Sequence, residues 1–136
     1  GDIYLEIGVQ AGRSLWIARQ LAKEGVRVGG IDLDVHTPSD SSVFFIQGDS
    51  KEVCKTWDKG EIKLLFIDGD HSYEGVKADW ENYGPMCKVV GFHDIDNKNE
   101  PGCVRLWNEL KAQHRFLEII DKPGELGIGI IFREPV

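Results

Sequence analysis

Residues 6–14 read Glu-Ile-Gly-Val-Gln-Ala-Gly-Arg-Ser, a glycine loop that separates an apolar run from a helical pattern. The apolar run, residues 3–8, is typical of a buried strand, and residues 14–23 carry apolar side chains at helical spacing. Glycines let the backbone turn sharply and approach a ligand, and a following helix offers free N–H groups at its start. The segment therefore predicts a strand, a ligand-facing loop and a helix.

Apolar runs and helical patterns alternate along the rest of the chain, which is typical of a parallel sheet covered on both faces. Further parallel strands are expected at residues 26–32, 43–47, 62–68 and 87–93. Helices are expected after Ser50, which would act as a cap, near Val76 and Trp80, and from Pro101 onward.

Two last strands are expected at residues 116–120 and 126–132, with a turn at Lys122, Pro123 and Gly124 between them. Such a turn favours an antiparallel pair. The predicted fold class is α/β, a Rossmann-like doubly wound sheet that is mostly parallel and ends in an antiparallel C-terminal hairpin.

One segment does not fit this pattern easily. The second and third strands are separated by few residues, among them His36, Thr37, Pro38, Ser39 and Asp40. A parallel crossover usually needs a dozen or more residues. Either the crossover helix is reduced to a loop or one of the two strand predictions is wrong.

Bulk properties set outer limits on function. A chain of 136 residues with 41% hydrophobic residues suits one globular domain, residues 1–136. The net charge of −7 argues against nucleic acid as the main partner, because phosphate binding needs a basic face. No apolar run is long enough for a membrane span and no signal peptide opens the chain. Three cysteines without metal-like spacing, Cys54, Cys87 and Cys103, suit reduced thiols in the cytoplasm.

Acidic residues accompany the ends of the first three strands. Asp32, in Gly-Ile-Asp-Leu-Asp, can accept hydrogen bonds from both ribose hydroxyls, and Asp49, in Gly-Asp-Ser, can lie near an adenine amino group. Glu6 would repel a pyrophosphate but could accept from the ammonium of an amino-acid-like ligand. A plain tight turn and ordinary helix caps are the alternatives. The order of the three motifs, each at the carboxyl end of a strand, favours a ligand site.

These three motifs resemble the successive cofactor motifs of class I S-adenosylmethionine-dependent methyltransferases. Residues 66–79, Phe-Ile-Asp-Gly-Asp-His-Ser-Tyr-Glu-Gly-Val-Lys-Ala-Asp, and residues 91–94, Gly-Phe-His-Asp, narrow the resemblance. They are similar to a bacterial family that includes macrolide-sugar and rhamnosyl O-methyltransferases and cephalosporin-type enzymes. The resemblance covers nearly the whole chain and implies S-adenosylmethionine as cofactor. The residues expected to bind it are Glu6, Gly8, Gly12, Asp32, Asp49 and Asp68.

The ends of the fourth and fifth strands carry a second group of residues. Asp68 and Asp94 would lie on neighbouring strands, about 4.8 Å apart, where converging carboxylates favour a divalent cation such as Mg²⁺. The resemblance implies that Asp68 is a metal ligand and that His71 is the general base. Where relatives usually have two acids, this chain has His93 and Asp94. His93 is therefore an unusual ligand, one that could bind a softer metal or act as a second base.

Structural roles remain open for several of these residues. Asp68 could belong to a plain turn, Asp70 could cap the helix near Ser72, and His71 could pack beneath the cofactor. Tryptophans at helical spacing are predicted to lie in the core, namely Trp16, Trp80 and Trp107. The acidic run at residues 74–81 is predicted to be a solvated helix face.

The predicted function is methyl transfer to a hydroxyl of a sugar or small metabolite. The alternatives are a non-catalytic cofactor-binding or assembly domain, in which His71 is idle, and a nicotinamide dehydrogenase, which Gln10 and Glu6 disfavour. Because the chain begins at its first strand, an N-terminal cap is expected to be absent, truncated or supplied by a partner. Exposed apolar surface near the glycine loop and the last helix would then favour self-association or a partner chain.

Overall fold

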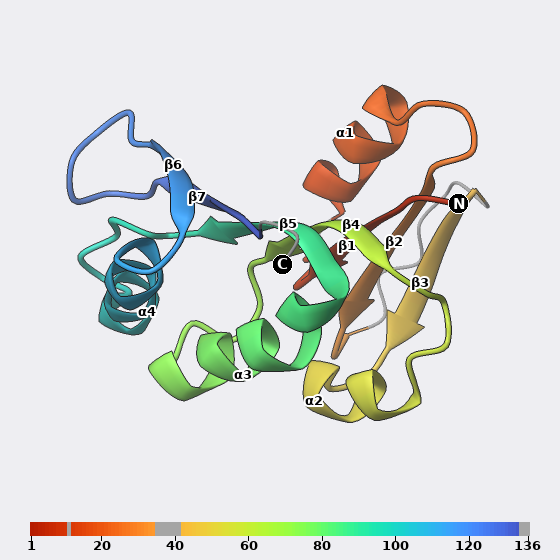
Figure 1. Cartoon of the computed structure of the whole chain (residues 1–136), viewed down its shortest axis with the longest axis horizontal. Helices are drawn as coiled ribbons and strands as arrows, with labels where there is room; N and C mark the ends of the chain where they lie inside the picture. Colours follow the sequence, from red (N-terminus) through yellow and green to blue (C-terminus); the bar gives the residue numbers. More distant parts are fainter. Residues whose placement is uncertain (11, 35–41, 134–136) are drawn as a thin grey trace.

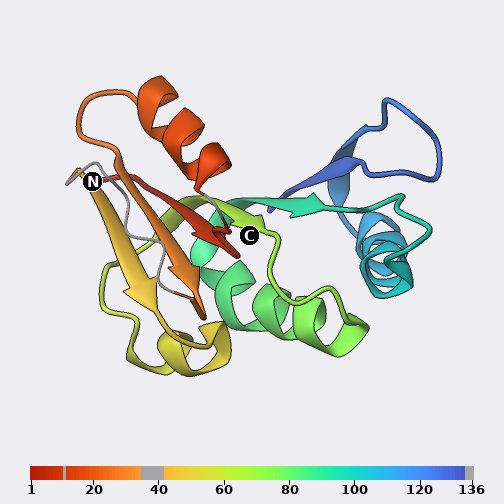
Figure 2. The ribbon, with the colours of Figure 1, turned by 180° about the vertical axis from the view of Figure 1, so that it is seen from behind.

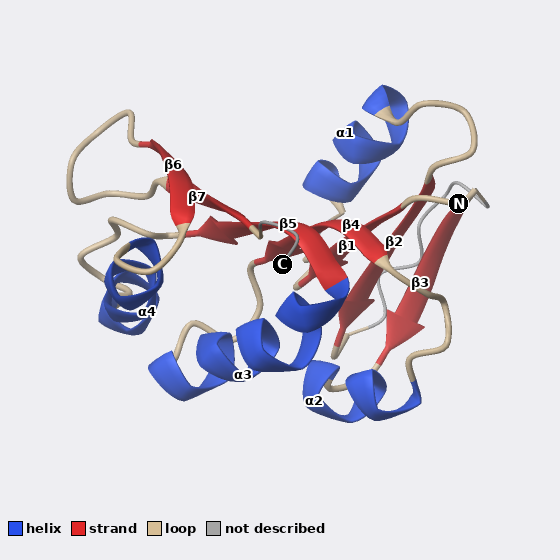
Figure 3. Cartoon of the chain, viewed as in Figure 1, coloured by secondary structure: helices blue, strands red, loops and turns tan. Residues whose placement is uncertain are grey.

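The computed structural model describes residues 1–10, 12–34 and 42–133, and the strands in these ranges form one sheet (Figure 3). The strands are β1 (Ile3–Ile7), β2 (Arg27–Asp32), β3 (Val43–Gln47), β4 (Ile62–Ile67), β5 (Cys87–His93), β6 (Arg115–Ile119) and β7 (Ile128–Phe132). Their order is β3-β2-β1-β4-β5-β7-β6. The first five strands are parallel, and β7 runs antiparallel between β5 and β6. The predicted Rossmann-like sheet with its antiparallel hairpin is confirmed.

The described helices divide unequally between the two faces of the sheet. They are α1 (Arg13–Leu21), α2 (Ser50–Val53), α3 (Tyr73–Tyr83) and α4 (Pro101–Lys111), with short 3-10 helices η1 (Cys54–Thr56) and η2 (Gly84–Met86). Of these, α1 lies on one face and α2, α3 and α4 lie on the other (Figures 1 and 2). None of the helices in the described ranges has the length and apolar character needed to cross a membrane.

Both strands that flank the short crossover are present, so both strand predictions are confirmed. The backbones of β2 and β3 pair in parallel, with Val28 opposite Val43 and Asp32 opposite Gln47. The polar residues predicted to form the crossover, 36–40, lie outside the described residues.

The main core lies between the sheet and the helices α3 and α4, where Leu65, Tyr83 and Trp107 are almost inaccessible to solvent. On the opposite face, a small cluster of Val9, Leu15 and Val28 packs beneath α1. Trp107 therefore lies in the core as predicted, and Trp80 is partly buried beside it. The prediction for Trp16 is wrong: its side chain is 58% exposed, because α1 is the one described helix on its face of the sheet.

Candidate active site

The glycine loop is held against the end of β4 by close backbone contacts. The N–H of Gly8 donates to the carbonyl of Ile31 (2.9 Å), and the N–H of Asp68 donates to the carbonyl of Ile7 (2.8 Å). Gly8 has a φ of +85°, and a Cβ atom placed on it would lie 2.1 Å from the carbonyl oxygen of Asp68. Only glycine fits here, so the loop and the end of β4 share one wall of the site.

A cleft of about 400 Å³ opens at this edge of the sheet. Four of the six predicted cofactor residues line it, namely Gly8, Asp32, Asp49 and Asp68. Five aspartates and one lysine border the cleft, namely Asp32, Asp49, Asp68, Asp70, Asp79 and Lys51. This balance of charge favours a cationic ligand and disfavours a pyrophosphate, as in a nicotinamide dinucleotide.

Asp32 supports the glycine loop from the end of β2. Its Oδ2 accepts from the backbone N–H groups of Val9 (2.8 Å) and Gln10 (2.9 Å), and its Oδ1 accepts from that of Asp34 (3.1 Å). Gln10 has a φ of +51°, so this carboxylate stabilises a left-handed backbone conformation that glutamine seldom adopts. Asp32 thus fixes the loop that faces the cleft, and its contact with a ribose stays a prediction.

The other two predicted cofactor residues, Glu6 and Gly12, anchor the start of α1. Glu6 is 1% exposed, and its carboxylate accepts from the hydroxyls of Tyr4 (2.6 Å) and Ser14 (2.9 Å). Burial raises the pKa of Glu6, although both hydrogen bonds oppose that shift. Gly12 caps α1 with a φ of +79°. The role of Glu6 toward an ammonium group stays a prediction.

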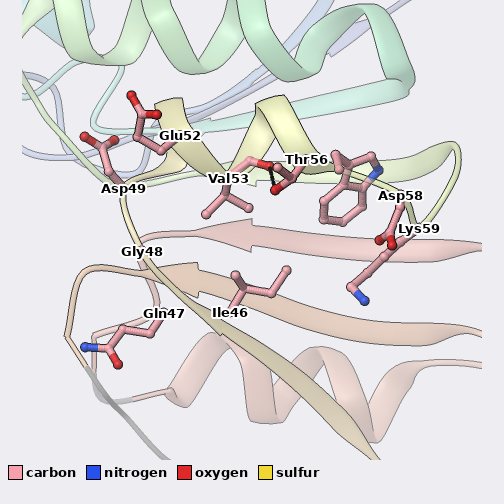
Figure 4. Close-up of a pocket in the computed structure, with 10 residues that line it drawn as sticks. Ile46, Gln47, Gly48, Asp49, Glu52, Val53, Thr56, Asp58 and Lys59 are labelled. Atoms are coloured by element: carbon pink, nitrogen blue, oxygen red, sulfur yellow. Dashed lines mark hydrogen bonds between the residues drawn. The ribbon is translucent and has the colours of Figure 1, made fainter.

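Asp49, rather than the predicted Ser50, caps α2. Its Oδ1 accepts from the backbone N–H of Lys51 at 3.0 Å. A second cleft of about 480 Å³ lies between β3 and α2 and shares Gly48 and Asp49 with the first (Figure 4). Asp49 therefore stands at the boundary between the two clefts.

The predicted acid and histidine group does come together beyond the end of β4. Nδ1 of His93 lies 3.3 Å from Oδ1 of Asp68 and 3.1 Å from Oδ2 of Asp94. Nε2 of His71 lies 3.2 Å from the same oxygen of Asp68. Asp94 is 3% exposed and has a φ of +63°, an unfavourable backbone conformation for a non-glycine residue.

Carboxylates set the acid–base properties of both histidines. Asp68, close to its ring nitrogen, raises the pKa of His93 to about 9 against the opposing effect of burial. Burial lowers the pKa of His71, but the hydrogen bond to Glu100 and the charge of Asp68 outweigh it and leave the pKa raised. A raised pKa makes the His71 imidazole a stronger proton acceptor.

Sequence reasoning did not identify Glu100, whose Oε1 lies 3.2 Å from Nδ1 of His71. Glu100 directly precedes α4, and Asn97 in the same loop donates to Oδ1 of Asp94 at 3.1 Å. One signal for both residues was available. They lie in the loop after a parallel strand, at the sheet edge where such folds bind ligands.

Comparison with known proteins identifies the family. Residues 5–97, more than half of the 136, match a family described as a methyltransferase domain. The chain belongs to this methyltransferase family. The methyltransferase domain is also 37% identical over 75 residues to the uncharacterised protein y4gI of Sinorhizobium fredii (strain NBRC 101917 / NGR234). That match covers 52% of this chain and only 8% of the relative.

Solved structures support the fold of the methyltransferase domain. CalS11, a TDP-rhamnose 3'-O-methyltransferase of calicheamicin biosynthesis, superposes with a TM-score of 0.70 at 20% identity, over 96% of this chain and 71% of that one. MycE from the mycinamycin pathway, in complex with Mg and SAH, superposes with a TM-score of 0.68 at 16% identity, over 93% and 44% of the two chains. The resemblance inferred from the motifs is thus confirmed for family and fold.

Asp79 of the methyltransferase domain lies beneath the cleft and corrects one prediction. Residues 74–81 were expected to form a solvated helix face, but Asp79 is 1% exposed and accepts from the hydroxyl of Ser50 at 2.5 Å. Burial raises the pKa of Asp79 to about 6. The folded domain therefore holds a proton on Asp79 more tightly than the unfolded chain does.

This shift predicts a pH-dependent effect of Asp79→Asn. Stability from the protonated carboxyl is present below the unfolded pKa near 4 and is lost as pH rises through about 6. Asparagine cannot ionise and can still accept from Ser50, so at pH 8 the variant should be more stable by about 2–3 kcal/mol. Urea denaturation at pH 4 and pH 8 measures the difference. An equal gain at both pH values would contradict the assigned pKa.

Proposed function

We propose that this domain transfers the methyl group of S-adenosylmethionine to a hydroxyl oxygen of a sugar or another small metabolite. The observation that carries the proposal is a cleft rich in aspartates that is continuous, through Asp68, with a cluster containing two histidines. Carboxylates stabilise a sulfonium cation and repel a pyrophosphate. The neighbouring histidines supply the proton acceptor that a hydroxyl needs.

The cofactor would extend along the cleft from Asp49 to Asp68. Asp32 would accept from the ribose hydroxyls and Asp49 would lie near the adenine amino group. Gly8 and Gly12 would allow the cofactor to approach the loop closely. The buried carboxylate of Glu6 would accept a hydrogen bond from the ammonium group of the cofactor.

His71 would take the proton of the acceptor hydroxyl as the oxygen attacks the methyl carbon. The reaction is an in-line displacement, so the protein must align the oxygen with the methyl group and remove one proton. Glu100, 3.2 Å from Nδ1 of His71, would position the ring and stabilise its protonated form. Glu100 is therefore a positioning residue in this proposal.

Asp68, Asp94 and His93 would hold a divalent cation next to the acceptor. Their ligand atoms lie within 4.8 Å of one another, a spacing that suits a shared ion. An ion bound there would lower the pKa of an acceptor hydroxyl that coordinates it. The two carboxylates fit Mg²⁺, the ion named for MycE, whereas the imidazole nitrogen of His93 does not.

Removing the Asp32 carboxylate should weaken cofactor binding. Hydrogen bonds to a charged group are each worth about 1.5–3 kcal/mol, which corresponds to a roughly 10- to 150-fold rise in the dissociation constant of Asp32→Ala. Isothermal titration calorimetry with S-adenosylmethionine measures this dissociation constant. Asp34→Ala, which removes an exposed carboxylate two residues away, is the matched control. Equal affinities in two folded variants would contradict the proposed role of Asp32.

The function itself is tested with cofactor carrying a labelled methyl group and a panel of hydroxylated sugars and small metabolites. Transfer to one of them is the expected result, together with binding of S-adenosylmethionine and not of NAD in titrations. Binding without transfer to any acceptor would support a non-catalytic domain instead. The net charge of −7 disfavours a nucleic acid as acceptor. Transfer of the methyl group to RNA would therefore contradict the proposed acceptor class.

We also propose that the domain is located in the cytoplasm. Its three cysteines are free thiols, which supports that location. Trp16, Ile17 and Leu21 expose apolar surface on α1, next to the glycine loop as expected. The second exposed area is on β6, at Leu117 and Ile119, and not on the last helix, because the large apolar side chains described for α4 are buried. These surfaces support the expected self-association, which stays a prediction.

A further inference from the structure

Three ligand atoms converge beyond the ends of β4 and β5. They are Oδ1 of Asp68, Nδ1 of His93 and Oδ2 of Asp94, and His93 lies 3.3 and 3.1 Å from the two carboxylates. Nδ1 of His93 is shielded from solvent, and none of the described residues forms a hydrogen bond with it. A buried nitrogen that faces two carboxylates calls for a positive charge at that point, either a proton on the imidazole or a metal ion that replaces it.

The two oxygens of the Asp94 carboxylate have different neighbours, and Oδ2 lies between His93 and, at 3.6 Å, Nδ1 of His71. Its Oδ1 accepts from Nδ2 of Asn97 at 3.1 Å, while its Oδ2 faces His93. Outer contacts of this kind orient the ligands of metal sites. The Asn97 contact therefore directs Oδ2 toward the same point as the His93 nitrogen.

From this ligand set, one imidazole nitrogen and two carboxylate oxygens, we infer that the site binds a first-row divalent transition ion, with Mn²⁺ as its probe, in preference to Mg²⁺. The inference deepens the proposed function, since it identifies the ion of that site. Mg²⁺ strongly prefers oxygen ligands, whereas imidazole is a good ligand for transition ions. A neutral imidazole and two carboxylates also balance the charge of a divalent ion, whereas a third carboxylate would leave a net negative charge.

The test is direct binding to chelator-treated protein. Titration calorimetry with Mn²⁺ and with Mg²⁺, and the loss of the free Mn²⁺ electron paramagnetic resonance signal, measure affinity without methyl transfer. We expect Mn²⁺ to bind the wild-type protein at least tenfold more tightly than Mg²⁺. His93→Asp, which restores an all-carboxylate set, should lower that ratio by on the order of tenfold.

Two further variants complete the experiment. His114→Asp makes the same substitution at a histidine that packs against Trp80, and it should keep the wild-type ratio. Asp94→Asn should weaken the binding of both ions, and circular dichroism checks that each variant is folded. Similar affinity of the wild type for the two ions, or the same ratio in His93→Asp, would overturn the inference.

The same data separate this inference from the proposed function. If the protein transfers methyl groups but does not prefer Mn²⁺ to Mg²⁺, the inference about the ion is wrong and the proposed function stands. Selective Mn²⁺ binding by a protein that methylates no acceptor would remove the proposed function and leave the inference standing.

Discussion

Replacing His71 with alanine should lower the turnover number for methyl transfer by about 10²–10⁴-fold, the usual contribution of a general base. His71 lies between Asp68 and Glu100, each 3.2 Å from one ring nitrogen, and these carboxylates raise its pKa. His71 is not among the described residues that line the cleft proposed for the cofactor. The dissociation constant of S-adenosylmethionine should therefore stay near the wild-type value, so that the loss appears in kcat.

His114→Ala is the matched control for this experiment. His114 bonds to the carbonyl of Leu110 and packs edge-on against Trp80, away from the cluster, so its removal should leave kcat within a few-fold of wild type. Glu100→Gln keeps the size of the side chain but removes the charge beside His71, and should give an intermediate loss. A His71→Ala protein with wild-type kcat would falsify the general-base assignment and leave alignment of the substrates as the source of catalysis.

The sequence predicts the position of a site residue best where that residue ends or directly follows a strand. Asp32, Asp68 and Asp94 each end or follow a parallel strand, and parallel strands bring their carboxyl ends to one edge of a sheet. The strand pattern alone therefore predicts that these three aspartates lie at one edge of the sheet. Gly8 followed from the same logic, since a loop between β1 and α1 must turn sharply at that edge.

The sequence failed where position depends on packing between distant elements. Glu100 contacts His71 because α4 begins next to the loop after β4, and no periodic pattern encodes that meeting of two loops. Asp79 lies in an acidic run typical of a solvated face, yet its position on α3 directs it to Ser50 of α2. Trp16 has core-like spacing but remains exposed, because whether a helix face is covered depends on its neighbours.

The backbone contact between β1 and β4 makes Gly8→Ala a test of the whole site. A Cβ atom would lie 2.1 Å from the carbonyl oxygen of Asp68, so the ends of the two strands would have to separate. That movement would strain the hydrogen bonds from Gly8 to Ile31 and from Asp68 to Ile7. Together with the φ of +85°, it should cost at least about 3 kcal/mol of unfolding free energy and abolish high-affinity cofactor binding.

Gly25→Ala separates the steric effect from the backbone effect. Gly25 has nearly the same φ, +86°, but a Cβ atom added to it would meet none of the described neighbours within 4 Å. Its substitution should cost only the left-handed penalty of about 1–2 kcal/mol and leave cofactor binding intact. Urea denaturation and titration with S-adenosylmethionine give both quantities for each variant. Equal destabilisation by the two substitutions would mean that β1 and β4 do not meet as closely as the proposed cofactor site requires, because the two variants differ in the contact of residue 8 with the backbone of Asp68 and Gly69.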